Sequence, residues 1–481
     1  MRKINLWIIL FLITGIFSCK NAKISAPEPV YPIPTQQQLD WHKLETYAFI
    51  HFTTNTFTGK EWGFGDESPE IFNPSELDAE QWVKTIKDAG LKAVILTCKH
   101  HDGFVLWPSK YTPHSVAASP YKNGKGDIVK EVSEACKKYG LKFGIYLSPW
   151  DRNRGDYGTP SYVDYYRMQL QELFENYGPV FEMWFDGANG GDGFYGGKNE
   201  KRKIDGKTFY DWPKTIELVR GLEPNILFFS DAGPDIRWVG NERGVAGSTN
   251  WNNISRDTLY AGKSGIEKLL NTGNESGANW VPAEVDVSIR PGWFYHKEED
   301  EKVKTPEQLF DIYLTSVGRG SNLLLNIPPD RRGLIHENDV NALLGWRKLL
   351  NERFSKNLAQ NAVVNTSSNF SKKLLPSHLT DGNTDSYWAA KKGSQSVDIT
   401  IKLSGKYLVS YVEIQENIAL GQRVKTFDVE LSENNQWVKK AEGTTIGYKR
   451  ILKITPTETD KIRITIKDSK AEPVLNEIKV W

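Results

Sequence analysis

The sequence predicts an α/β protein: a (β/α)8-type barrel followed by a C-terminal β-sandwich. Short apolar runs alternate with amphipathic helical stretches from about residue 44 to residue 350, a pattern typical of parallel strands covered by helices. After Phe354 the pattern changes to short runs of alternating apolar and polar residues. An open doubly wound sheet is the alternative, but the first expected strand is not followed by the G-x-G-x-x-G of a dinucleotide-binding fold.

The elements of the barrel follow in order along the chain. Strands are expected at residues 47–52, 93–97, 143–147, 180–188, 226–230, 281–287 and 322–327. Helices are expected at residues 78–89, 127–139, 163–177, 209–222, 306–317 and 337–353. Asp78 and Asp127 are suitable N-caps for the first two helices, and Gly90 and Gly140 are suitable stops. Residues 189–207 are rich in Gly and Lys and predict a loop at the active face.

The N-terminus indicates export. Met1-Arg2-Lys3 and a long apolar run precede Ser18-Cys19, which is typical of a secretory signal. Residues 1–18 resemble a bacterial lipoprotein signal, and this resemblance implies that Cys19 is lipidated. An uncleaved membrane anchor is the alternative, although the run is short for a span. Residues 19–36 are proline-rich and predict a linker, so we expect a periplasmic or cell-envelope protein that contacts the membrane only through its lipid.

The composition excludes several partners. The chain has 61 basic and 60 acidic residues, a balance that gives no electrostatic basis for binding nucleic acid or an anionic membrane surface. Its 16 tryptophans suit the apolar faces of sugars, but they also suit a large core. Cys98 and Cys136 fit neither a disulfide framework nor a metal-ligand spacing. We expect both thiols to be buried as small apolar groups.

The domain boundaries follow from the same pattern, with a barrel at residues 37–354 and a sandwich at residues 355–481. Alternating runs occur at residues 396–403, 408–416, 426–431, 461–466 and 475–481, as in antiparallel sandwiches. The stretch LTDGNTDSYW, followed by SVDITIKL and YVEI, resembles discoidin-like (F5/8 type C) domains. This resemblance implies a jelly-roll sandwich, and many such domains bind a galactoside or a calcium ion. Asp381, Asn383 and Thr384 offer oxygen ligands for a structural calcium ion, or they form a turn.

Polar residues gather where strands of the barrel should end. The run VFEMWFDGA is apolar until Asp186, and a carboxylate at the end of a buried strand must be hydrogen-bonded, paired or used in chemistry. A cap on the following turn is the alternative. His51 ends the first strand, and His100 and His101 follow the second. Their imidazole nitrogens can bond sugar hydroxyls, although satisfied core histidines are the alternative.

Two further acidic segments accompany Asp186, one at residues 235–244 with Glu242 and one at residues 284–296 with Glu284. Glycoside hydrolysis requires two carboxyl groups, one of which protonates the leaving oxygen. The chain lacks the G-x-S-x-G elbow of serine hydrolases and the phosphate-binding G-x-x-x-x-G-K-[ST] loop. It also lacks H-x-H and H-E-x-x-H, so no metal is expected in catalysis.

The motifs HFTTNTF, GKEWGFGDESPEIFNP, GLKAVILTCKHHDGF, YLSPWD and VFEMWFDGA occur in this order and strongly resemble the α-L-fucosidases of glycoside hydrolase family 29. The resemblance implies a retaining mechanism that needs no cofactor, with Asp186 as the nucleophile. It implies substrates that are fucosylated oligosaccharides or glycoconjugates. The residues that it places around fucose are His51, Trp62, His100, His101, Trp150 and Trp293.

The acid/base follows from a narrower resemblance. W-x-G-N-E-x-G at residues 238–244 and the stretch SIRPGWFYH resemble the branch specific for α-1,3/1,4-linked fucose, which implies that Glu242 is the acid/base. Glu284 is its rival for this role and is otherwise expected as a substrate contact. We therefore expect release of terminal fucose from branched, Lewis-type glycans. The alternatives are a broad fucosidase acting on α-1,2-linked or aryl fucosides, a catalytically inactive glycan-binding lipoprotein and a metal-dependent hydrolase.

Overall fold

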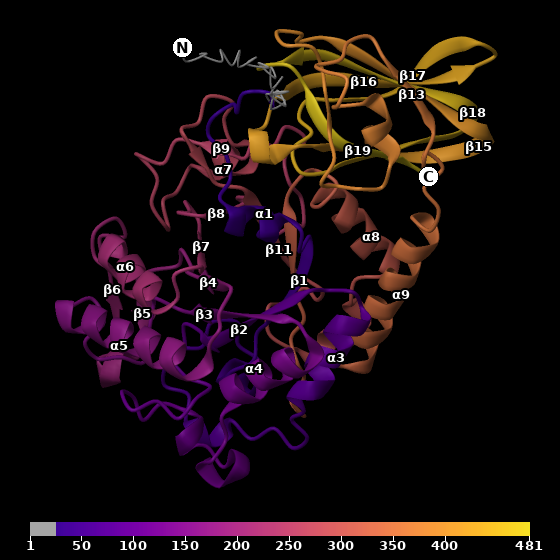
Figure 1. Cartoon of the computed structure of the whole chain (residues 1–481). Coiled ribbons are helices and arrows are strands. Elements are labelled where there is room, and N and C mark those ends of the chain that lie inside the picture. The colour runs from indigo at the N-terminus through magenta and orange to yellow at the C-terminus, as the bar shows by residue number, and fades with distance from the viewer. Residues whose placement is uncertain (1–25) are drawn as a thin grey trace, which may run out of the picture.

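The computed structural model describes residues 26–481 and contains a parallel barrel followed by an antiparallel domain (Figure 1). The barrel closes in the order β1-β12-β11-β8-β7-β4-β3-β2. Its strands are β1 (Thr46–Ile50), β2 (Ala93–Lys99), β3 (Lys142–Leu147), β4 (Glu182–Trp184), β7 (Leu227–Ser230), β8 (Ile236–Trp238), β11 (Ala283–Ser288) and β12 (Asn322–Asn326). This closed sheet confirms the predicted barrel.

The expected signal segment and Cys19 lie outside the described residues. Among residues 26–481, the structure has no helix with the length and apolar character of a membrane span.

Helices surround the barrel, as strand–helix alternation predicts (Figure 1). They are α3 (Ala79–Asp88), α4 (Ile128–Tyr139), α5 (Pro160–Tyr177), α6 (Trp212–Leu222), α7 (Glu267–Thr272), α8 (Pro306–Thr315) and α9 (Glu337–Arg353), with the short α1 (Gln36–His42) and α2 (Thr54–Thr58) near β1. The predicted caps are confirmed: the Asp78 carboxylate accepts from two backbone N–H groups of α3, and the Asp127 carboxylate accepts from one of α4. Gly140 ends α4 in the left-handed region that glycine favours.

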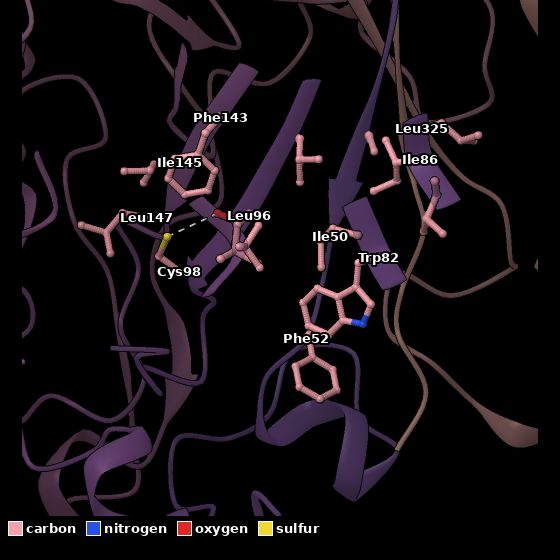
Figure 2. Close-up of a cluster of buried hydrophobic side chains, with 14 of the residues drawn as sticks. Ile50, Phe52, Trp82, Ile86, Leu96, Cys98, Phe143, Ile145, Leu147 and Leu325 are labelled. Atoms are coloured by element: carbon pink, nitrogen blue, oxygen red, sulfur yellow. Dashed lines mark hydrogen bonds between the residues drawn. The ribbon is translucent and has the colours of Figure 1, made fainter. Parts of the chain in front are cut away.

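Outward-facing side chains of the barrel strands pack with the helices in one apolar core (Figure 2), and the inside of the barrel holds a second apolar cluster. Side chains of neighbouring strands, including Ile50 and Leu96, face Trp82 and Ile86 of α3. The indole N–H of Trp82 donates to the carbonyl of Gly333 at 2.8 Å, so its polar atom is satisfied inside the core. Cys98 and Cys136 are buried free thiols, as expected.

The strand β8 was not among the expected strands. It spans only three residues, and Arg237 at its centre breaks the apolar pattern. The fully buried guanidinium donates to the carbonyls of Leu270 at 2.8 Å and Trp251 at 2.9 Å. Residues 231–235, all described, join β7 to β8 without a helix. Hydrophobic periodicity cannot reveal so short a strand when a charged residue occupies its middle.

The C-terminal domain is antiparallel and encloses its own apolar core, as predicted. Its strands are β13 (Val363–Thr366), β14 (Trp388–Ala389), β15 (Val397–Glu416), β16 (Val424–Glu433), β17 (Gln436–Gly443), β18 (Arg450–Ser469) and β19 (Val474–Val480). Two runs expected as separate strands are joined in β15, where a register shift between Lys402 and Tyr407 marks the break. The unexpected β17 is polar along most of its length, so its alternation is weak.

Candidate active site

A pocket of about 200 Å³ opens where the barrel strands end, which is where barrel enzymes carry their chemistry. It has room for about one sugar ring. A larger groove beside α1 lies at the opposite ends of these strands, away from the strand-end acids and histidines. The pocket is lined by Phe49, His51, Trp62, His100, His101, Tyr146, Trp184, Asp186, Gly187, Ala188, Asp231, Trp238, Glu242, Asp286 and Trp293.

Asp186 lies two residues after the end of β4 and has both carboxylate oxygens engaged. The Tyr146 hydroxyl donates to Oδ2 at 2.8 Å, and the backbone N–H of Ala188 donates to Oδ1 at 2.7 Å. Nε2 of His101 lies 3.7 Å from Oδ2. The carboxylate therefore forms the turn contact that the sequence allowed, and it also faces the pocket, because 22% of its side chain remains exposed.

Two of the pocket histidines are neutral near neutral pH and have a defined orientation. Burial lowers the pKa of His51 to about 3 and the pKa of His101 to about 4. Nδ1 of His51 lies 2.8 Å from Oδ1 of Asn326. Nδ1 of His101 lies 2.7 Å from the hydroxyl of Ser148, which itself donates to the Trp150 carbonyl. Both Nδ1 atoms thus carry the proton, and each Nε2 is left as an acceptor for a ligand hydroxyl.

The third histidine, His100, lies against the ring of Tyr146, with centroids 5.8 Å apart and planes inclined by 15°. Burial holds its pKa well below the usual range for histidine. Its Nδ1 atom has no hydrogen-bond partner among the described residues. A buried polar atom of this kind is costly unless a ligand or water completes it, so His100 is suited to receive a polar group in the pocket.

Trp62 and Trp293 form walls of the pocket, whereas Trp150 does not. Trp62 is 51% exposed, and its ring stands nearly perpendicular to those of His101 and Trp150, with centroids 5.6 and 5.7 Å away. Trp293 lies 5.3 Å from His51, centroid to centroid. Trp150 is only 2% exposed. It packs behind Trp62 and His101, which corrects its expected place in the pocket lining.

The segment at residues 189–207, expected as an irregular loop, forms a hairpin of β5 (Gly191–Gly193) and β6 (Glu200–Arg202). Its glycines permit this compact path, because a side chain at Gly191 would collide with the Trp150 ring. The Tyr195 hydroxyl accepts a hydrogen bond from the Trp150 indole N–H at 2.9 Å. The hairpin therefore supports Trp150 from behind and acts on the pocket through that tryptophan.

Glu242 lies in the turn after β8 and lines the same pocket as Asp186. The indole N–H of Trp293 donates to its Oε2 at 3.3 Å. Loss of hydration in the pocket raises the pKa of Glu242, and the nearby charges of Asp186 and Glu61 raise it further. A carboxyl group with a raised pKa beside an ionised carboxylate can donate a proton near neutral pH.

Glu284 is fully buried and is not among the residues that line the pocket. Its carboxyl oxygens accept from the Trp184 indole N–H at 2.8 Å and from the Tyr47 hydroxyl. It packs beside Glu182, and burial raises the pKa of Glu284 to about 7. Asp286, two residues further along β11, reaches the pocket instead, because alternate side chains of a strand share one face. This position corrects the expectation that Glu284 contacts substrate.

The sequence reasoning missed Asp231 as a pocket residue, and from the acidic segment at residues 284–296 it singled out Glu284, whereas Asp286 lines the pocket. Asp231 follows β7 directly, its Oδ2 accepts from the Gly262 N–H at 2.7 Å, and burial together with Asp186 raises its pKa to about 6. A methyl group at Gly187 would lie 2.0 Å from this oxygen, so the absent side chain makes room for it. The signal was available, because Asp231 ends a strand in FFSDAG as Asp186 does in WFDGA.

A parallel barrel with a sugar-sized pocket, acidic side chains and neutral histidines at its strand ends is the architecture of a glycoside hydrolase. The Alpha-L-fucosidase family model matches residues 25–353, and the F5/8 type C domain model matches residues 363–477. The chain therefore belongs to the α-L-fucosidases, glycoside hydrolase family 29, and carries a C-terminal F5/8 type C domain.

Relatives support this assignment over nearly the whole chain. Alpha-L-fucosidase 1 of Arabidopsis thaliana is 40% identical, and the match covers 100% of this chain and 94% of that protein. A putative α-L-fucosidase from Bacteroides thetaiotaomicron superposes with a TM-score of 0.87 at 39% identity, covering 95% and 99% of the two chains. A Ruminococcus gnavus family 29 fucosidase, solved in complex with fucose, gives a TM-score of 0.86 at 34% identity, covering 95% and 96%.

Proposed function

We propose that this α-L-fucosidase is exo-acting and retaining, and that it releases α-1,3/1,4-linked fucose from branched, Lewis-type glycans. The observation that carries the proposal is that Asp186 and Glu242 line one pocket of about 200 Å³. Because such a pocket accepts a single terminal sugar, cleavage occurs at the end of a glycan. The fucose complex of the Ruminococcus gnavus relative supports fucose as that sugar.

The chemistry is a double displacement. Asp186 attacks the anomeric carbon while protonated Glu242 gives its proton to the departing oxygen, which leaves a fucosyl ester on Asp186. Glu242, now ionised, removes a proton from water, and the resulting nucleophile opens the ester and regenerates both carboxyl groups. The Tyr146 hydroxyl and the Ala188 N–H keep the attacking carboxylate oriented throughout.

The neutral histidines bind the sugar hydroxyls in this mechanism. Nε2 of His51 and Nε2 of His101 accept from fucose hydroxyls, because each Nδ1 proton is already used. Trp62 and Trp293 pack against the apolar C–H faces of the ring, as aromatic side chains do with sugars. Asp231 and Asp286 complete the polar lining.

The linkage preference is tested by product analysis on three fucosides. We expect faster release of fucose from a Lewis-type trisaccharide than from an α-1,2-linked or an aryl fucoside. The support for this ranking is that the W-x-G-N-E-x-G segment at residues 238–244 resembles the branch specific for α-1,3/1,4-linked fucose. A higher kcat/KM for the α-1,2-linked or aryl substrate would show a broad fucosidase instead, while leaving the fucosidase activity itself intact.

We further propose a structural calcium site in the C-terminal domain. Asp381 accepts from the Asn383 N–H and the Ser386 hydroxyl, each at 2.8 Å, so the turn expected there is present. Burial raises the pKa of the nearby Glu477 to about 7, and its Oε1 has no hydrogen-bond partner among the described residues. Residues 26–481 contain no group of three or more His, Cys, Asp or Glu side chains that could hold a metal ion. The remaining ligands are therefore Asn383 and Thr384 oxygens or carbonyls, which calcium accepts.

A chelator tests this site. We expect chelation to lower the Tm of the wild-type protein and added calcium to restore it, because a bound ion stabilises only the folded state. Glu477→Gln keeps the side-chain size and should make the Tm insensitive to the chelator. A Tm of the wild-type protein that does not respond to either addition contradicts the calcium proposal.

For the N-terminal segment we propose export and lipidation at Cys19, which would hold the enzyme at the periplasmic or outer face of a membrane. The support is the sequence of residues 1–19. Expression of the full chain in a bacterial host should give a membrane-bound protein, and Cys19→Ser should release it. Recovery of the wild-type protein in the soluble fraction only would contradict the anchor.

A further inference from the structure

The acid/base Glu242 lies on a segment that has little structure of its own. Residues 239–252, all of which the structure describes, form neither helix nor strand between β8 and β9 (Asn253–Ile254). Backbone polar groups in such a segment need partners from elsewhere when they are buried. The source of those partners decides how firmly Glu242 is held.

The barrel supplies the partners nearest to Glu242. The side-chain amide of Asn271 donates to the carbonyls of Val239 at 3.1 Å and Val245 at 3.2 Å, which closes the turn around Glu242. The N–H of Ala246 donates to the Thr315 carbonyl at 2.9 Å. These contacts fix the two ends of the turn.

The C-terminal domain supplies the next set of partners. The backbone N–H of Asn250 donates to the Thr445 hydroxyl at 2.9 Å. The Gln422 amide spans two positions: its Oε1 accepts from the Asn252 N–H at 2.8 Å, and its Nε2 donates to the Asn250 carbonyl at 3.0 Å. Gln422 and Thr445 are each 1% exposed. Figure 1 shows β9 and α7 beside the C-terminal sheet.

The two sets of contacts are connected inside the segment. The Asn250 side chain accepts from the Arg237 guanidinium of β8 at 3.2 Å and donates to the Arg319 carbonyl at 2.9 Å. The Arg319 guanidinium donates to the Ala246 carbonyl at 2.7 Å. The anchored position 250 is thereby tied to β8, on one side of Glu242, and to Ala246, on the other.

We propose that the C-terminal domain is part of the catalytic unit, and that Gln422 and Thr445 are positioning residues for the acid/base Glu242. This inference rests on the assignment of Glu242 in the proposed function. Proton transfer requires the acid to lie within hydrogen-bond reach of the leaving oxygen, so loosening the segment weakens that step selectively. Attack by Asp186 is unaffected, because Asp186 is held by Tyr146 and Ala188.

The test compares two substrates on the full-length enzyme. Phenyl α-L-fucoside needs a proton on its leaving group, whereas the fluoride of α-L-fucosyl fluoride departs with little help from an acid. The double variant Gln422→Met/Thr445→Val keeps side-chain volume and removes the hydrogen bonds of these two side chains with Asn250 and Asn252. We expect kcat/KM to fall about tenfold or more on the phenyl substrate and to change little on the fluoride. For the phenyl substrate, the alkaline limb of the pH profile of kcat/KM should also shift in the double variant.

Thr465→Val is the matched control, because its hydroxyl donates to Asp398 at 2.7 Å within the C-terminal domain. It should leave both substrates unchanged. Equal losses on both substrates, or the same selective loss in the control, overturn the positioning role. If the double variant does not fold, single Thr445→Val provides the same comparison. Glu242→Ala calibrates the assay: without a selective loss on the phenyl substrate, the acid/base assignment itself fails, and the inference fails with it.

Discussion

Replacing Asp186 with alanine is expected to lower kcat on any α-L-fucoside by at least about 10³-fold, because the change removes the carboxylate that forms the covalent intermediate. The carboxylate faces the pocket with both oxygens oriented by Tyr146 and Ala188. Neither partner can replace it: a phenol hydroxyl that donates to a carboxylate is a poor nucleophile at neutral pH, and a backbone N–H is not one.

The measurement is steady-state hydrolysis of phenyl α-L-fucoside, with and without azide. In the Asp186→Ala variant a small azide ion fits the vacated space and should attack directly, giving fucosyl azide of inverted configuration. Asp164→Ala provides the control, since Asp164 is an exposed carboxylate on α5 away from the pocket. Turnover by Asp186→Ala at the wild-type rate would exclude Asp186 as the nucleophile.

Replacing Glu242 with alanine is expected to slow hydrolysis of phenyl α-L-fucoside by about 10²- to 10⁴-fold, the usual contribution of a general acid/base. On α-L-fucosyl fluoride, whose leaving group needs little help from an acid, azide should partly restore turnover, because it attacks the fucosyl–Asp186 ester without a general base. The azide product should then keep the configuration of the substrate, in contrast to the product of the Asp186 variant. The pair of products assigns both carboxyl groups in one experiment.

Glu284→Gln is the matched control for Glu242. Glu284 is fully buried under Trp184 and hydrogen-bonded to it at 2.8 Å, so the change should alter the Tm more than the response to azide. Azide rescue of a Glu284 variant, with none for Glu242→Ala, would reverse the assignment. The pH profile provides an independent check. Because the pocket raises the pKa of Glu242, the acid stays protonated to a higher pH than an exposed glutamate. Activity should fall only above that raised pKa.

Much of this molecule could be predicted from local pattern. The alternation of strands and helices indicated the barrel, and the caps Asp78 and Asp127 marked the starts of α3 and α4. The strand-end position of Asp186, His51 and His101 placed them at one face of the barrel, because parallel strands bring their carboxyl ends together. These features depend on residues that are close in sequence and on the parallel direction of the barrel strands.

Other features depend on depth and on contacts between distant residues. Glu284 and Asp286 lie two residues apart on β11, so their side chains point to the same face of the strand. Only Glu284, the deeper of the two, is covered by Trp184 and Tyr47. Trp150 is held behind Trp62 by a hairpin whose glycines carry no periodic signal. Hydrophobic pattern records which side of a strand a residue occupies, but not how far it lies from the mouth of the barrel.

The chain's own order of residues thus specified the barrel, the C-terminal antiparallel domain and the strand-end acids and histidines, since periodicity and caps are local properties. Only the tertiary structure showed which acids reach the pocket and which residues hold the segment that carries Glu242. It also showed the short strand β8, which the buried Arg237 stabilises. Each of these depends on side chains that are far apart in sequence, such as Asn250 and Gln422. Their pairing follows from how the two domains pack, which no local pattern encodes.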